Sequence, residues 1–467
     1  MFLRQIFDPE LAQYAYILGC QRTGEALVID PERDIDRYVE IAAEEGLRII
    51  AAAETHIHAD FLSGTREFAE QHGVKLYLSD EGDADWKYNW VKAGHYDVQL
   101  LKDNDVFDIG NIRVQALHTP GHTPEHMSFL VTDLGGGVTE PIGIVSGDFV
   151  FVGDLGRPDL LETAAGVVGA REPSARRLFE STKRFLALDD HLQVWPGHGA
   201  GSACGKALGA VPQSTVGYER RYNAALSFDT EEAFVGAILA GQPEPPAYFA
   251  RMKNLNKNGV PLLGDVPSPK LRTAAELVEL GTKDDAVVVD TRRDRLAYMA
   301  GHVPGSIYAP LGIDFAMVVG SYVDPRTEIF LVVDSADLDE TVRTLVRIGY
   351  DRVGGYAPPS TLVDAGVAEE IIERIDFVEL EADLDHEKYT ILDVRGAGEY
   401  AESHLPGAIN IAHTRLSLRI EEVPRGKPVL AHCRTGNRAS FAVSLLKKAD
   451  YDVTFVDGMF NEWPGWV

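Results

Sequence analysis

The chain has 467 residues, of which 45% are hydrophobic and 25% are charged, as in ordinary globular proteins. Its 72 acidic and 44 basic side chains give a formal net charge of −28, and no basic patch interrupts this excess, so we expect neither nucleic-acid nor membrane binding. At this length we expect about three domains.

The beginning of the chain has no apolar stretch of signal-peptide length, and no later run is long enough to cross a bilayer. We therefore expect a cytoplasmic protein. The three cysteines, Cys20, Cys204 and Cys433, are an odd and sparse set that forms no disulfide framework. Each is then either a buried hydrophobe or a reactive thiol, and we expect Cys20, which follows an apolar strand, to lie in the core.

Residues 1–245 are predicted to form the first domain, in which short apolar strands alternate with polar helices. The apolar run 49–53 predicts a buried strand, and the loop after it carries His56, His58 and Asp60 at alternate positions, where imidazoles can converge on one ion. Further potential ligands follow apolar strands at glycine-containing turns: His122, Asp148 and His198. The pattern predicts a metal site.

This pattern resembles the metallo-β-lactamase superfamily, whose αββα sandwich carries a loop that usually reads His-x-His-x-Asp-His. In that family two metals share seven ligands, but Phe61 stands in place of the final His here. The resemblance implies one complete ligand set: His56, His58, His122 and Asp148. It implies a second set that lacks one member: Asp60, Asp148 and His198. Because a binuclear hydrolase needs two metals about 3.5–4 Å apart, the sequence favours one metal.

Two histidines and one carboxylate with open coordination positions favour non-haem Fe(II) and O2 chemistry. The persulfide dioxygenases are the branch of the superfamily that works in this way. This resemblance implies one Fe(II) per chain, held by His56, His122 and Asp148, with zinc as the alternative occupant. The other polar residues would be second-shell groups or a vestigial second site: His58, Asp60 and His198. The competing interpretation is a scatter of loop histidines that cap turns, which the family order of the four motifs opposes.

A proline- and asparagine-rich passage over 246–269 predicts a docked connector. After it a pattern occurs twice, in which a buried strand ends in Asp-x-Arg, at Asp290 and Asp393, and a His-x-Pro-Gly turn precedes the next strand. Self-similarity at domain length predicts two copies of one α/β unit, over 270–375 and 376–467. Both copies resemble rhodanese domains, which implies a central parallel sheet in each.

The second copy contains a loop that suits a nucleophile. The strand 428–432 runs into Cys433, ahead of a glycine-containing turn and a helical pattern. The rest of the predicted sulfur-binding loop is Arg434, Thr435, Gly436, Asn437 and Arg438. Backbone N–H groups, the helix dipole and the two arginines favour a thiolate, so we predict a catalytic Cys433. A protein phosphatase loop would be one residue longer, and an inert buried cysteine would need apolar neighbours.

The first copy lacks this chemistry. Its corresponding strand runs into Ser335, which we pair with Cys433, and three carboxylates follow, at Asp337, Asp339 and Glu340. Because carboxylates would repel an anionic thiosulfate or persulfide, we expect the first copy to be inactive and structural.

Cys204 follows His198 by six residues in a glycine-rich loop, which leaves chemistry and packing equally open. The loop and the domain order resemble CstB-type dioxygenase–rhodanese fusions. This resemblance favours a chemical role for Cys204 over a packing role. The resemblance implies that a persulfide of glutathione, coenzyme A, bacillithiol or a similar thiol is oxidised by O2 to sulfite, and that Cys433 couples sulfane sulfur with sulfite to give thiosulfate. We also expect a homo-oligomer, either a dimer or a tetramer.

Two alternatives remain open at this point. One is a zinc-dependent thioester hydrolase of the glyoxalase II type that carries rhodanese-like interaction modules. The other is that both C-terminal domains only scaffold the enzyme or sense sulfur.

Overall fold

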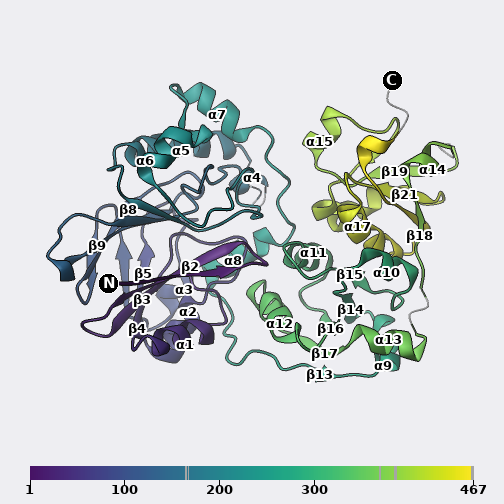
Figure 1. Ribbon diagram of the computed structural model, residues 1–467, viewed down its shortest axis with the longest axis horizontal. Helices are drawn as coiled ribbons and strands as arrows, with labels where there is room; N and C mark the ends of the chain where they lie inside the picture. Colours follow the sequence, from purple (N-terminus) through teal and green to yellow (C-terminus); the bar gives the residue numbers. More distant parts are fainter. Residues whose placement is uncertain (164–165, 167, 368–369, 383–386, 464–467) are drawn as a thin grey trace. The chain divides into compact units, whose positions relative to one another are not determined.

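The computed structural model describes residues 1–163, 166, 168–367, 370–382 and 387–463 (Figure 1). The chain forms two compact units. The first contains residues 1–265 together with Val346–Gly349, and the second contains Val266–Leu345 together with Tyr350–Val467. Among the described helices, none combines the length and the apolar character needed to cross a membrane.

The first unit is built on two six-stranded sheets. One has the order β1-β2-β3-β4-β5-β6, with β1 (Phe2–Asp8), β2 (Gln13–Cys20), β3 (Glu25–Ile29), β4 (Arg48–Ala53), β5 (Lys75–Ser79) and β6 (Val98–Leu101). The other has the order β12-β11-β10-β9-β8-β7, with β7 (Val106–Ile109), β8 (Ile112–His118), β9 (Met127–Asp133), β10 (Gly143–Gly147), β11 (Gln193–Pro196) and β12 (Ser214–Thr215).

Helices cover the outer faces of both sheets, so the first unit is an αββα sandwich (Figure 1). The helices are α1 (Asp36–Glu44), α2 (Thr65–His72), α3 (Asn89–Ala93), α4 (Leu160–Thr163), α5 (Arg171–Leu186), α6 (Val216–Tyr222), α7 (Glu231–Leu239) and α8 (Phe249–Asn258). Between the sheets lies an apolar core that includes Tyr16, Val114 and Phe129. Tyr38 and Phe68 pack outside the first sheet, and Leu178 and Phe234 outside the second.

Within each sheet, two strands that precede the predicted metal-site loops run parallel. Strand β3 pairs in parallel with β4, and β10 pairs in parallel with β11. Because the carboxyl ends of parallel strands meet at the same edge of a sheet, the loops after β10 and β11 lie at one edge of the second sheet. The loop after β4 lies at the corresponding edge of the first sheet, beside the loop after β3.

The second unit contains two five-stranded parallel sheets with the same topology, β13-β17-β16-β14-β15 and β18-β22-β21-β19-β20. The first has β13 (Lys270–Leu271), α9 (Ala274–Gly281), β14 (Ala286–Asp290), α10 (Arg295–Ala300), β15 (Ile307–Tyr308), α11 (Phe315–Tyr322), β16 (Glu328–Val332), α12 (Leu338–Arg347), β17 (Val353–Ala357) and α13 (Pro359–Ala365). The second has β18 (Glu373–Ile375), α14 (Phe377–Ala382), β19 (Thr390–Asp393), α15 (Ala397–Glu402), β20 (Ile409–Asn410), α16 (Leu416–Arg419), β21 (Val429–His432), α17 (Asn437–Lys448) and β22 (Val453–Val456). The predicted fold class, an αββα sandwich followed by two α/β domains with parallel sheets, is confirmed.

The strand register aligns the two copies. Asp290 at the end of β14 lies opposite Val332, the last residue of β16. In the second copy, Asp393 at the end of β19 lies opposite His432, the last residue of β21. Val332 and His432 therefore occupy equivalent positions.

This register corrects one prediction from the sequence. The residue that follows β16, and so corresponds to Cys433, is Val333, which is 1% exposed. Ser335 lies two positions further on and is exposed. Pairing Ser335 with Cys433 was therefore wrong, because the sequence does not reveal which residues face each other across parallel strands. The first copy still has no cysteine at this place.

Candidate metal centre and cysteine loop

His56, His122 and Asp148 form a buried cluster at the strand ends of the first unit. Nε2 of His122 lies 3.4 Å from Oδ2 of Asp148, and Nε2 of His56 lies 3.9 Å from the same oxygen. One potential ligand atom from each residue lies within 4.8 Å of the others. The structure thus brings together the three residues predicted to hold the metal.

The chemistry of this cluster fits a cation. Among the described residues, neither carboxylate oxygen of Asp148 has a hydrogen-bond partner, although the side chain is fully buried. Leaving a buried carboxylate uncompensated costs several kcal/mol. Burial also lowers the pKa of His56 and of His122, so both imidazoles are neutral at pH 7 and can donate a lone pair to a metal.

The second ring nitrogen of each histidine is anchored. Nδ1 of His122 lies 3.0 Å from the carbonyl oxygen of Arg157. Nδ1 of His56 lies 2.9 Å from Oγ1 of Thr55, and the Thr55 hydroxyl donates to Oδ2 of Asp30 at 2.8 Å. These contacts fix both rings and leave both Nε2 atoms for a metal, as hydrogen bonds to the other ring nitrogen of a ligating histidine do in metalloproteins.

His58 binds a different partner. Its Nε2 lies 3.0 Å from Oδ1 of Asp30, and its ring centroid lies 4.4 Å from that of Phe61. Burial lowers the pKa of His58, but the adjacent Asp30 carboxylate more than offsets this and raises the pKa to about 9. The Asp30 contact engages Nε2 of His58, whereas its buried Nδ1 has no hydrogen-bond partner among the described residues, so that His58 is not a ligand stays a prediction.

Asp30 was not identified from the sequence, although it holds both His56 and His58. The one signal in the sequence was a carboxylate directly after the apolar run of β3. The structure adds that Asp30 has a backbone φ of +51°, which is uncommon for a residue other than glycine. Its partners lie about 25 residues later in the chain. Their proximity depends on the parallel pairing of β3 with β4.

Asp60, His198 and Cys204 form a second buried cluster beside the first. Nε2 of His198 lies 3.2 Å from Oδ2 of Asp60 and 3.4 Å from Oδ1 of Asp148. The thiol of Cys204 belongs to the same group of ligand atoms, all within 4.8 Å of one another. From the sequence, the second ligand set lacks one member because Phe61 replaces a histidine. The structure places the thiol of Cys204 beside the remaining members, Asp60 and His198.

The surroundings of Cys204 are acidic. Burial, followed by the Asp60 and Asp148 carboxylates, raises the pKa of this thiol well above its usual value near 9. Without a neighbouring cation, Cys204 keeps its proton at pH 7. A metal ion bound to this cluster would reverse that preference, because it stabilises the thiolate.

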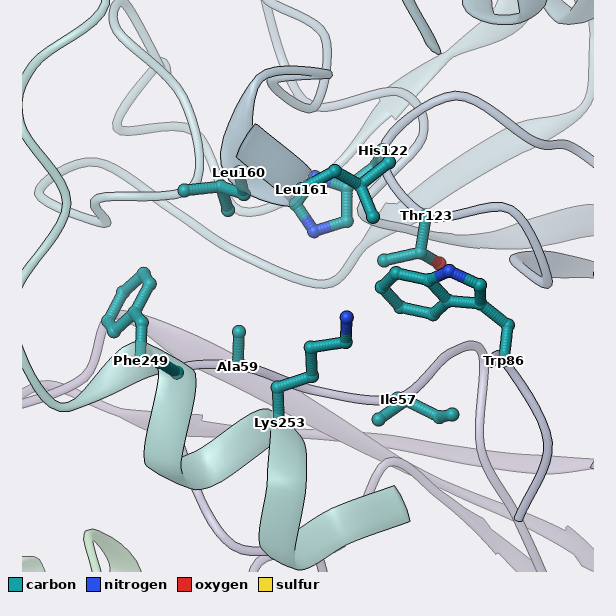
Figure 2. A pocket seen from close by; sticks show the side chains of 10 residues that line it. Ile57, Ala59, Trp86, His122, Thr123, Leu160, Leu161, Phe249 and Lys253 are labelled. Atoms are coloured by element: carbon teal, nitrogen blue, oxygen red, sulfur yellow. The ribbon is translucent and has the colours of Figure 1, made fainter. Parts of the chain in front are cut away.

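A cavity of about 20 Å³ lies beside His122 (Figure 2). Apolar side chains line it: Ile57, Ala59, Trp86, Leu160, Leu161 and Phe249. Lys253 of α8 points into it, and its Nζ lies 3.7 Å from the centroid of the Trp86 ring. A water molecule needs about 10–15 Å³ in a cavity, so this space admits only the end of a substrate, and its cation favours an anionic end.

The segment predicted as a connector contributes to this site. Within 246–269 the structure has the helix α8, which carries Lys253. The amide of Asn256 on the same helix donates to the carbonyl oxygens of His58, at 2.8 Å, and Phe61, at 2.7 Å. Helix α8 therefore fixes the backbone of the metal-site loop, a role that sequence composition did not reveal.

The cysteine loop of the second copy joins β21 to α17. Cys433 and Gly436 are buried, whereas Arg434, Thr435 and Asn437 are exposed. Gly436 has a φ of +87°, in the left-handed region that glycine tolerates best. Arg434 borders a cavity of about 220 Å³, together with Arg395 and Phe460.

Arg438 is less available than the sequence indicates. Its guanidinium pairs with Glu399, with Nη2 2.9 Å from Oε1. Part of the positive charge predicted for this loop is therefore neutralised, and Arg434 is the more accessible of the two arginines.

Comparison with known proteins agrees with this architecture. The model of the metallo-beta-lactamase superfamily matches residues 8–198, and that of the rhodanese-like domain matches residues 376–465. A solved metallo-beta-lactamase from Staphylococcus aureus subsp. aureus COL is 41% identical, with a TM-score of 0.68, over 77% of this chain and 99% of that one. The chain belongs to the metallo-beta-lactamase superfamily.

Curated relatives of this superfamily member match about half of the chain. The mitochondrial persulfide dioxygenase ETHE1 of Bos taurus is 26% identical over 237 residues, which cover 50% of this chain and 78% of that protein. A beta-lactamase hydrolase-like protein of Agrobacterium fabrum (strain C58 / ATCC 33970) is 28% identical over 257 residues. The match covers 50% of this chain and about half, 54%, of the length of that relative. Together with the two family-model matches, these likenesses describe a metallo-beta-lactamase-family enzyme that also carries a rhodanese-like domain.

Proposed function

We propose that this protein is an Fe(II)-dependent persulfide dioxygenase joined to a sulfurtransferase, as in CstB-type fusions. The observation that carries the proposal is the buried cluster of His56, His122 and Asp148, whose carboxylate lacks a hydrogen-bond partner among the described residues. Two histidines and one carboxylate form the donor set that suits non-haem Fe(II) and O2. The similarity to a persulfide dioxygenase and the matched rhodanese domain both support sulfur chemistry.

The proposed oxidation is R–S–SH + O2 + H2O → R–SH + SO3²⁻ + 2 H⁺, in which the sulfane sulfur gives four electrons to O2. Iron bound by the three ligands would supply the activation of O2. The residues of the chain bind and orient the substrate. Lys253 attracts the anionic sulfur end into the small cavity beside His122, and the carrier thiol, such as glutathione, coenzyme A or bacillithiol, stays outside.

The proposed second reaction takes place at Cys433. Its thiolate forms an S–S bond with the sulfane sulfur of a persulfide, while the S–S bond of the donor breaks and the carrier leaves as a thiol. Sulfite then attacks the outer sulfur of the Cys433 persulfide, so that thiosulfate leaves and the thiolate returns. Sulfite from the first reaction is thereby converted to thiosulfate.

An Asp148→Asn variant tests the first reaction. In the full chain with glutathione persulfide, we expect O2 uptake to fall by at least about 100-fold together with the iron content, because the amide supplies neither the charge nor the second anionic oxygen. Cys433→Ser is the matched control and should keep both. O2 uptake by Asp148→Asn at the rate of the control would contradict the proposal.

The second cluster favours one other candidate function. A carboxylate, a histidine and a thiol are all zinc ligands, and Asp60, His198 and Cys204 lie next to Asp148. Two zinc ions sharing Asp148 would suit a thioester hydrolase of the glyoxalase II type. Hydrolysis of a glutathione thioester without O2 uptake would favour this candidate.

A further inference from the structure

Arg295, at the start of α10 in the cysteine-free copy, contacts the cysteine loop of the other copy within the second unit. Its Nη1 donates to Oδ1 of Asn437 at 2.7 Å. Its Nη2 donates to Oδ1 of Asp457 at 2.9 Å and to the carbonyl oxygen of Thr435 at 3.3 Å. One guanidinium thus joins the loop, the first residue of α17 and the residue after β22.

The contact with Thr435 fixes a peptide group inside the loop. Because a trans peptide is planar, with its C=O and N–H on opposite sides, turning the Thr435 carbonyl toward Arg295 turns the Gly436 N–H away from it. Gly436 adopts a φ of +87°. A residue in this region next to right-handed backbone makes a concave set of N–H groups that binds anions, so the orientation of this peptide bears on an anionic sulfur at Cys433.

The contact with Asp457 removes an opposing charge. A Cβ atom placed on Gly436 would lie 2.3 Å from Oδ1 of Asp457 and 3.1 Å from Nη2 of Arg295, so both groups press directly against the loop. A bare carboxylate there would repel a persulfide or thiosulfate anion. Arg295 neutralises one oxygen, and Arg374, with Nε 3.2 Å from Oδ2, neutralises the other.

We propose that Arg295 is a positioning residue for sulfur transfer at Cys433, so that the cysteine-free domain completes the active loop of its neighbour. Arg295 holds the Thr435–Gly436 peptide in its anion-binding orientation and screens Asp457 from the reacting sulfur. This inference rests on the proposed sulfur transfer at Cys433. It gives the degenerate copy a part in the reaction beyond structural support.

The test is sulfur transfer from thiosulfate to cyanide by the full chain with Arg295→Met, Arg295→Lys and, as the matched control, Arg293→Met. Arg293 precedes Arg295 by two residues, is exposed and pairs with Asp337 at 3.6 Å. We expect Arg295→Met to lower kcat/KM by about 10- to 100-fold, mainly through kcat, because a misplaced group costs rate out of proportion to its distance. Arg295→Lys should recover part of the loss, and Arg293→Met should match the wild type.

A double variant separates positioning from general damage. If Arg295 screens Asp457, adding Asp457→Asn to Arg295→Met should raise kcat/KM, so that the two effects are not additive. Equal kcat/KM in Arg295→Met and Arg293→Met would overturn the inference. Should Arg295→Met fail to fold, judged by its melting temperature, equal kcat/KM in Arg295→Lys and Arg293→Lys would overturn it instead. Absence of transfer by the wild type would count against the proposed function.

Discussion

The two cysteines predicted to do chemistry lie in opposite surroundings. Burial, and after it the carboxylates of Asp60 and Asp148, raise the pKa of the Cys204 thiol. Cys433 is also buried, but it starts a glycine-containing loop ahead of α17. The same side chain thus lies in an acidic cluster in one unit, and in the other it precedes the exposed Arg434 and Arg438, which is paired with Glu399.

Burial alone therefore does not decide whether a cysteine is reactive. A thiol among carboxylates becomes a thiolate when a cation is bound beside it. A thiol at the start of a helix is stabilised as a thiolate by N–H groups and by the helix dipole. We therefore expect Cys204 to depend on the metal and Cys433 to act without one.

Replacing Cys433 should have the largest effect. In Cys433→Ser, transfer of sulfur from thiosulfate to cyanide should fall by about 1,000-fold or more, because a hydroxyl is a far weaker nucleophile at neutral pH. The iron content and O2 uptake with glutathione persulfide should persist, since the metal ligands lie in the other unit. Substantial sulfur transfer by this variant would show that Cys433 is not the nucleophile and would contradict the different roles assigned to Cys204 and Cys433.

Replacing Cys204 should have a smaller and different effect. In Cys204→Ser we expect the iron to be retained and the O2 uptake rate to fall by about tenfold, or the product to shift from thiosulfate toward sulfite. Rates are read with an oxygen electrode and products by chromatography of the sulfur anions. Wild-type rates with an unchanged product ratio would assign Cys204 to packing and would leave Cys433 as the one reactive thiol of this comparison.

Acid should destabilise the domain that contains Cys433, because a buried histidine, His413, packs against Phe441 of α17. Burial, together with Arg438, lowers the pKa of His413 to about 3. In the unfolded chain this histidine binds a proton below about pH 6.5, whereas in the folded chain it does not. The free energy of unfolding therefore falls by about 2 kcal/mol between pH 6.5 and pH 5. The contribution of neutral His413 to the stability of the fold is thus fully present above pH 6.5 and declines as the pH falls toward 3.

His413→Gln should reduce this acid sensitivity, since glutamine does not titrate. Thermal unfolding of the full chain at pH 7 and pH 5 provides the measurement, with His404→Gln as the control because His404 is an exposed histidine in the same domain. Equal losses of melting temperature in His413→Gln and His404→Gln would show that the neutral state of His413 does not contribute.

The smallest effect is expected in the cysteine-free copy. Neither Ser335→Cys nor Val333→Cys should produce a second site of sulfur transfer, because this loop lacks the glycine turn and is followed by carboxylates. The assay uses each variant on a Cys433→Ser background, where any transfer must come from the new thiol. Turnover by Val333→Cys, which occupies the place of Cys433 in the register, would show that the loop is not degenerate.

The sequence predicted the fold class, and it singled out three polar residues that the structure brings together, because both depend on local patterns. The roles of the site residues stay predictions. His56, His122 and Asp148 each follow an apolar strand at a turn, and Cys433 stands at a strand–helix junction. These loops belong to both sheets, β4 in the first and β8 and β10 in the second, and the folded sandwich brings them together.

The sequence could not predict contacts that depend on tertiary packing. Asp30, Lys253 and Arg295 reach their sites from distant segments, and nothing in their local sequence marks them. Cys204 joins the second cluster because its loop meets the other loops in space. The register that replaces Ser335 by Val333 likewise depends on how the strands pair.

The most direct test of the account is metal analysis of the anaerobically purified wild-type chain, combined with O2 uptake on glutathione persulfide. We predict about one iron per chain, held by two histidines and one carboxylate. We also predict that one O2 is consumed for each sulfane sulfur that is oxidised. Two zinc ions per chain, with no O2 uptake and with hydrolysis of a thioester, would contradict it.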